Sequence, residues 1–212
     1  MDKILDRMGL FDLIAVLLPG SIAVSLTIIF DQIIFGFGIS KYVNTDDIVV
    51  FLIISYFVGM IYQEFGSLTY KYLINAKNAV LRRSLDTTRK NSSLTSAEKE
   101  AVQKIVCKEL HLSEMPDDNQ LFNYCRYSGG STAHSDKEQS LAAMSLNLSL
   151  YFFMLSLVIG FWAIFHSVGN LGVAAVLLMV GLLLLQRSVR YYSVRFVRVV
   201  RTFYYSYAKE HQ

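Results

Sequence analysis

Long apolar runs separated by charged stretches are the main feature of this chain of 212 residues. No Asp, Glu, Lys or Arg occurs in residues 13–30, 48–63 or 139–186. A helix needs about 20 mainly apolar residues to cross a bilayer, so the first two runs each suit one span and the third suits two. The third run lapses at Gly169 and Asn170, which indicate a turn. We therefore predict four transmembrane helices, at about 13–30, 48–63, 141–165 and 171–185.

Helical patterns continue outside these runs. Apolar residues keep a helical spacing from the end of the second run to about residue 84. Thr95 followed by Glu98 predicts a capping box that opens a helix to about residue 110, and a shorter helix follows Pro116 and ends at 129–130. Ser135 with Glu138 predicts a second capping box, at the start of the helix that becomes the third span. The sequence thus predicts an all-α membrane protein whose helix extensions form a small bundle outside the membrane.

Charge predicts the orientation of the spans. Every Lys and Arg except Lys41 lies in residues 1–12, 63–141 or 187–212. Positively charged loops remain in the cytoplasm, so we expect both termini and the large loop there, and the loops 31–47 and 167–170 on the outer side of a bacterial inner membrane. The predicted segments are an N-terminal membrane hairpin (1–64), a cytosolic helical insert (65–140), a second membrane hairpin (141–186) and a basic amphipathic cytosolic helix (187–212).

The C-terminal helix carries arginines on one side and apolar or aromatic residues on the other. The basic side consists of Arg187, Arg190, Arg195, Arg198 and Arg201. Three interpretations are open: a solvated surface over a packed aromatic face, contact with anionic lipids or a cytosolic protein, and contact with nucleic acid. Direct nucleic-acid binding is the least supported, because no base-stacking or glycine-rich motif accompanies the arginines.

Few residues inside the predicted spans could have a special role. Pro19 removes a backbone hydrogen bond and Gly20 follows it, so a helix kink is expected there. Small residues recur four apart, as Ser55 with Gly59 and Ser156 with Gly160. This spacing lets helices approach closely, both within a four-helix fold and in a homo-oligomer such as a tetramer. Asn147 is predicted to bind a neighbouring helix rather than an ion.

Motifs for catalysis are missing from the sequence. It contains no nucleophile elbow, phosphate-binding glycine loop or His-Glu-x-x-His pattern, so we predict no enzyme activity, no cofactor and no small-molecule substrate. Cys107, His111, Cys125 and His134 could offer zinc ligands, but their spacing matches no compact zinc motif, and no metal site is predicted. Both cysteines fall in the predicted cytoplasmic loop, where thiols stay reduced.

The N-terminal residues carry a resemblance to a known group of proteins. Phe11-Asp12-Leu13-Ile14 followed by Leu18-Pro19-Gly20 resembles the start of many small bacterial membrane proteins encoded with phage-defence genes. The layout of four spans with a helical cytosolic insert is similar to the membrane subunit of the two-gene Kiwa defence system. The resemblance implies an oligomeric sensor at the inner membrane that binds a cytosolic DNA-binding partner and restrains phage replication. It transfers no site residues.

Two other functions remain open. An oligomer could act as a pore-forming or membrane-disrupting effector of abortive infection, which would depolarise the cell when triggered. The chain could also be an accessory subunit of a larger transport or envelope complex. The effector interpretation differs from the sensor in whether the membrane part conducts ions.

Overall fold

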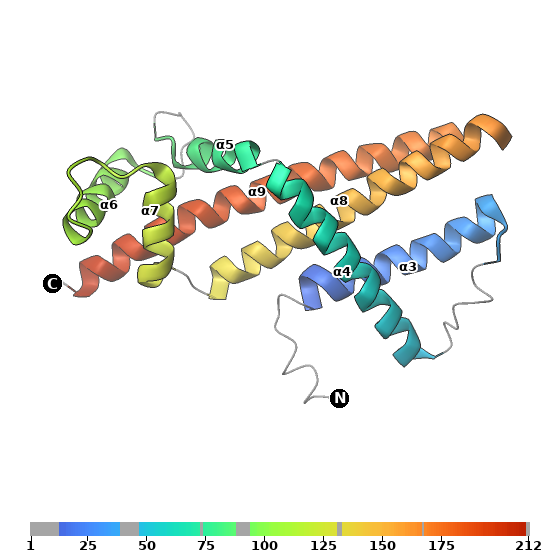
Figure 1. Ribbon diagram of the computed structural model, residues 1–212, viewed down its shortest axis with the longest axis horizontal. Helices are drawn as coiled ribbons and strands as arrows, with labels where there is room; N and C mark the ends of the chain where they lie inside the picture. The colour runs from blue at the N-terminus through green and yellow to red at the C-terminus, as the bar shows by residue number, and fades with distance from the viewer. Residues whose placement is uncertain are drawn as a thin grey trace. The chain divides into compact units, whose positions relative to one another are not determined.

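The computed structural model describes residues 13–38, 47–72, 74–87, 94–130, 133–166 and 168–210. Every regular element among them is helical, which confirms the predicted all-α class. The elements are η1 (Leu13–Leu17), α3 (Leu18–Phe30), η2 (Asp31–Phe35), α4 (Ile48–Tyr72), α5 (Ile74–Leu85), α6 (Ser96–Glu109), α7 (Asp118–Cys125), η4 (Arg126–Gly130), α8 (Ala133–His166) and α9 (Asn170–Glu210) (Figure 1).

The described helices group into two compact units. Unit 1 takes its members from Met1–Thr69 and Ser140–Ser188, and unit 2 from Tyr70–Gln139 and Val189–Gln212. Helices α8 and α9 contribute residues to both units.

Among the residues that the structure describes, four helical stretches are long and apolar enough to cross a membrane, as the sequence predicted. They are Leu13–Phe35, Ile48–Thr69, Ser135–His166 and Asn170–Glu210. Large apolar side chains are exposed on them, for example Phe57 at 61% and Ile164 at 69%. In a bilayer such side chains face lipid, so the exposed apolar surface fits a multi-pass membrane protein.

The first span is longer than predicted. Asp31 was expected in an outer loop, but it lies in the π-helical turn η2 and its side chain is fully buried. Its carboxylate accepts a hydrogen bond from the Phe37 amide at 3.0 Å, and its carbonyl accepts one from Gly36, which has a left-handed conformation (φ 69°). The carboxylate satisfies a backbone group at the helix end, so a charged residue belongs to the span here.

Unit 2 has its own apolar core. Helices α5, α6, α7 and the C-terminal part of α9 enclose it, and Phe122 of α7 meets Phe196 of α9 edge to face with 4.9 Å between ring centroids. The fully buried core residues include Leu85, Leu94, Val102, Val106, Leu121, Cys125, Val199 and Val200. The aromatic and apolar side of the C-terminal helix is thus packed inside a helical bundle.

Capping boxes open two helices of unit 2, α6 and α7. The predicted box at Thr95 is confirmed, because Glu98 N donates to Thr95 Oγ1 at 3.2 Å and Thr95 N donates to the Glu98 carboxylate at 2.8 Å. An unpredicted box between Asp117 and Gln120 opens α7. The predicted box at Ser135 is wrong: α8 begins at Ala133, so Ser135 already lies inside the helix and cannot cap it.

Candidate functional site

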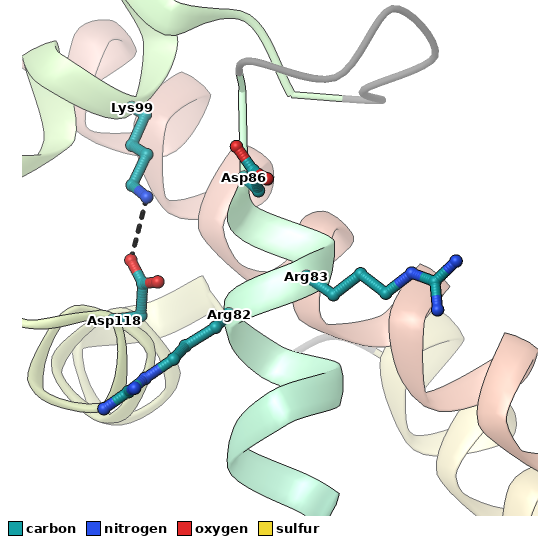
Figure 2. Close-up of a pocket in the computed structure, with 5 residues that line it drawn as sticks. All are labelled: Arg82, Arg83, Asp86, Lys99 and Asp118. Carbon is teal, nitrogen blue, oxygen red and sulfur yellow. Dashed lines mark ion pairs between the residues drawn. The ribbon is translucent and has the colours of Figure 1, made fainter.

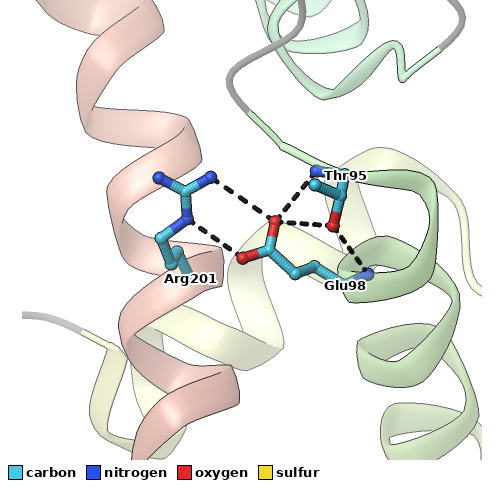
Figure 3. A network of polar contacts seen from close by, with 3 residues as sticks. All are labelled: Thr95, Glu98 and Arg201. Carbon is cyan, nitrogen blue, oxygen red and sulfur yellow. Dashed lines mark hydrogen bonds and ion pairs between the residues drawn. The ribbon is translucent and has the colours of Figure 1, made fainter.

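A polar network joins the start of α6 to α9 in unit 2 (Figure 3). The Thr95 hydroxyl and amide donate to Glu98 Oε2 at 2.9 and 2.8 Å. Arg201 donates from Nη2 to Oε2 at 3.4 Å, and its Nε lies 3.3 Å from Oε1. Burial disfavours the charged carboxylate, but the hydrogen bonds from Thr95 and the Arg201 guanidinium outweigh it, and together they lower the pKa of Glu98.

The five C-terminal arginines differ in their exposure and in their contacts. Arg187 and Arg190 are exposed. Arg195 is buried, with 6% of its surface accessible. Arg198 Nη1 lies 2.6 Å from Glu138 Oε1, and Arg201 binds Glu98. Sequence periodicity places these residues on one side of the helix, but it does not reveal that acidic residues distant in the chain cover that side.

A shallow depression of about 420 Å³ lies where α5 ends beside α6 and α7 (Figure 2). Lys99 Nζ is held at 2.8 Å from Asp118 Oδ1 and donates to the Leu85 carbonyl at 2.9 Å. Arg82 and Arg83 are exposed and their side chains point in different directions. Because the cations diverge and Lys99 is neutralised, this place does not concentrate charge on one small anion. It suits charged contacts with a larger surface.

In unit 1 one buried amide compensates for a proline. In a regular α-helix the amide of residue 19 would donate to the Ala15 carbonyl, but Pro19 has no N–H. Asn147 of α8 donates from Nδ2 to this carbonyl at 2.7 Å, and the Asn147 side chain is almost fully buried. The prediction that Asn147 binds a neighbouring helix is therefore confirmed. At the predicted kink the backbone changes from the π-helical turn η1 to the α-helical α3, with Pro19 in the first turn of α3.

Helices α3 and α4 make a very close crossing at two glycines. A Cβ atom added to Gly20 would lie 1.8 Å from the Ser55 carbonyl oxygen, and one added to Gly59 would lie 2.1 Å from the Val16 carbonyl oxygen. Only glycine permits this approach, which brings each Cα next to a carbonyl of the other helix. The Ser55 and Gly59 pair is therefore engaged within the chain.

Three serine hydroxyls join α8 to α9, which run side by side in opposite directions (Figure 1). The donor and acceptor pairs, each at 2.8 Å, are Ser149 with the Gly181 carbonyl, Ser156 with the Ala174 carbonyl, and Ser188 with the Ala142 carbonyl. Gly160 also faces Ala174: a Cβ atom added to Gly160 would lie 3.7 Å from the Ala174 Cβ. The small residues repeat every seven positions on both helices, a signal that a search for four-residue spacing misses.

The two cysteines of unit 2 differ in their surroundings. Both are free, and Cys107 Sγ donates to the Leu112 carbonyl at 3.2 Å. Burial raises the pKa of the Cys125 thiol to about 12, so it remains protonated at neutral pH. Among the residues that the structure describes, no group of three or more His, Cys, Asp and Glu side chains could hold a metal ion. The side chain of His134 lies outside this description.

In the part of the chain that the structure describes, the fold and these contacts define a helical protein with four candidate membrane spans and a second, separately packed helical unit. Comparisons with protein-family models, curated proteins and solved structures find no match to this chain.

Proposed function

We propose that the chain is an oligomeric, multi-pass subunit of the bacterial inner membrane whose unit 2 binds a cytosolic protein. We further propose, from the resemblance in the first span and in the span layout, that it acts in antiphage defence as the sensor that positions this partner. The observation that carries the proposal is a difference between the polar side chains of the two units. In unit 1 the side chains of Asn147, Ser149 and Ser156 donate to backbone carbonyls of the same chain, whereas unit 2 exposes charged side chains such as Arg82 and Arg83.

The contacts inside unit 1 support an anchor rather than a conducting path. The Asn147 side-chain amide donates a hydrogen bond to the Ala15 carbonyl, and the Ser149 and Ser156 hydroxyls donate to carbonyls of α9. A polar side chain that lines an ion path must be free to replace water around the ion. These side chains instead form hydrogen bonds between helices, which stabilise a membrane anchor.

The charge distribution supports the orientation. Lys and Arg are concentrated in and around unit 2, whereas the loop 31–47 contains a single basic residue, Lys41. Under the positive-inside rule this distribution favours a cytoplasmic unit 2, whose basic residues would then come close to anionic lipid head groups. Arg82 and Arg83 are the best candidates for contact with the partner, because both are exposed and neither supports the core.

A binding experiment tests the proposal. The full chain is purified in mild detergent with the protein encoded by the neighbouring gene, because the resemblance implies a two-gene system. We expect a stable complex that Arg82→Glu with Arg83→Glu weakens at least tenfold, while the exposed Arg190→Glu control binds as the wild type does. If the wild-type chain does not bind that protein, the proposal that unit 2 positions a cytosolic partner is wrong.

A second measurement separates the proposal from the effector alternative. Cells carrying the two genes should plate phage less efficiently than cells lacking either one, and a potential-sensitive dye should report no early depolarisation. Depolarisation by this chain without a partner would instead identify a pore-forming effector.

A further inference from the structure

Arg195 in α9 has an unusual environment for an arginine. Only 6% of its surface is exposed, and its Nε and Nη2 atoms are buried without a hydrogen-bond partner. None of the ion pairs found among the described residues includes it. A buried guanidinium whose N–H groups lack acceptors is costly, because those groups lose their hydrogen bonds to water and do not regain them in the protein. No residue that the structure describes supplies an acceptor to these two nitrogen atoms.

The surroundings of Arg195 are basic on one side. Its guanidinium carbon lies 6.0 Å from the centre of the Phe122 ring, and Arg126 is close enough to repel its charge. Asp136 and Glu138 attract it, but the Glu138 Oε1 atom already lies 2.6 Å from Arg198. Arg195 and Arg126 thus repel each other, and neither takes part in an ion pair found among the described residues.

Two further features favour an anion over a water molecule. Nε and Nη2 lie on the same edge of the guanidinium plane, which is the pair that donates to two oxygens of one phosphate or carboxylate. Asp136 belongs to the first turn of α8, so the amino end of this 34-residue helix is also nearby and adds its positive dipole. A water molecule would offer an acceptor but no charge. An oxyanion offers both.

We propose that Arg195, with Arg126 and the first turn of α8, binds the phosphoryl group of a soluble phosphate compound or of an anionic lipid. This inference does not depend on the proposed function. The two nitrogen atoms are covered in the structure, so the anion must displace part of that cover. Binding therefore alters the stability of unit 2, which makes thermal unfolding a suitable measurement.

The experiment uses the full chain in phosphatidylcholine nanodiscs and inorganic phosphate as the probe. In a Cys107→Ser background, which removes the half-buried thiol, a thiol-reactive dye follows unfolding through Cys125, which is fully buried in the core of unit 2. Phosphate should raise the midpoint temperature saturably, by several degrees at concentrations far above its Kd, and beyond the effect of chloride at equal ionic strength. Arg195→Met, which keeps the length and removes the charge, should abolish the shift. The exposed Arg190→Gln control should retain it.

A second arm distinguishes the two sources of phosphate. If the ligand is a lipid, nanodiscs containing phosphatidylglycerol should raise the midpoint of the wild type but not of Arg195→Met, and added phosphate should then have little further effect. Arg126→Gln, which changes an exposed side chain, should weaken either response several-fold, so the proposal stays testable if Arg195→Met folds poorly. A shift of equal size in the wild type and both variants, or no shift with either probe, would overturn the proposal.

Discussion

The pairing of Asn147 with the carbonyl freed by Pro19 makes a quantitative prediction. Asn147→Leu keeps the number of side-chain heavy atoms and the branch at Cγ but leaves the Ala15 carbonyl without its 2.7 Å donor. A buried group that loses its partner costs about 1–3 kcal/mol, and hydrogen bonds between membrane helices average about 0.6 kcal/mol. We therefore expect the free energy of unfolding of unit 1 to fall by about 1 kcal/mol, or about fivefold in the equilibrium constant.

A double-mutant cycle isolates this contact from packing effects. Pro19→Ala provides an amide that can donate to Ala15 in the usual i to i−4 pattern, so the carbonyl no longer needs Asn147. In the Pro19→Ala background, Asn147→Leu should cost about 1 kcal/mol less than it does in the wild type. Any loss of packing beside Gly66, which approaches Asn147 closely, occurs in both backgrounds and cancels.

The single tryptophan offers a local reporter for this cycle. Trp162 of α8 meets Phe35 of η2 edge to face at 5.4 Å and stacks on His166 at 3.8 Å, so its fluorescence should change when the first span separates from α8. The equilibrium is measured by titrating the full chain with sodium dodecyl sulfate in mixed micelles. Additive effects of the two substitutions would refute the argument that Asn147 compensates for Pro19.

Three further predictions concern packing, pH and thiol reactivity. Gly20→Ala should destabilise unit 1 by about 1–3 kcal/mol in the same titration, because its Cβ would lie 1.8 Å from a backbone oxygen, whereas Gly172→Ala, with open space around it, should be neutral. Because the pKa of Glu98 lies below 4.5, its contribution to unit 2 is present above that pH and is lost as the pH falls through the folded value; thermal unfolding of Glu98→Gln should therefore depend less on pH in this acidic range. At pH 8 the half-buried Cys107 should react with a maleimide much faster than Cys125, and equal rates would contradict a packed core in unit 2.

Apolar patterning was enough to predict the fold class and the number of spans. Spans depend on long runs of one kind of residue, which a sequence shows directly. The Thr95 capping box was also predictable, because both of its partners lie within one helical turn. Asp31 was misplaced because a charge usually marks the end of a span. Here its carboxylate serves the backbone of the turn that follows.

The arginines of the C-terminal helix show why the candidate site was harder to predict. A helical wheel uses neighbours within one helix, whereas the partners of Arg198 and Arg201 are Glu138 and Glu98, which are distant in sequence. The wheel predicted the packed side correctly, since apolar burial depends only on the helix's own pattern. The opposite side depended on contacts between helices, and periodicity holds no information about those.

The small residues of the spans bear on the proposed oligomer. Gly59 lies against the Val16 carbonyl of the same chain, and Ser156 donates to the Ala174 carbonyl of the same chain. These small-residue faces are therefore occupied inside one subunit, and association between subunits must use other surfaces, such as the large apolar side chains exposed on α4 and α8. Gly59→Leu would consequently disrupt the α3–α4 crossing within one subunit, so its effect on mass could not be assigned to subunit association. Substitution of the exposed Phe57 by Ala, with the mass of the detergent-solubilised particle as the measurement, tests association without disturbing that crossing: a smaller particle places α4 in the interface, and an unchanged oligomer excludes this face of α4.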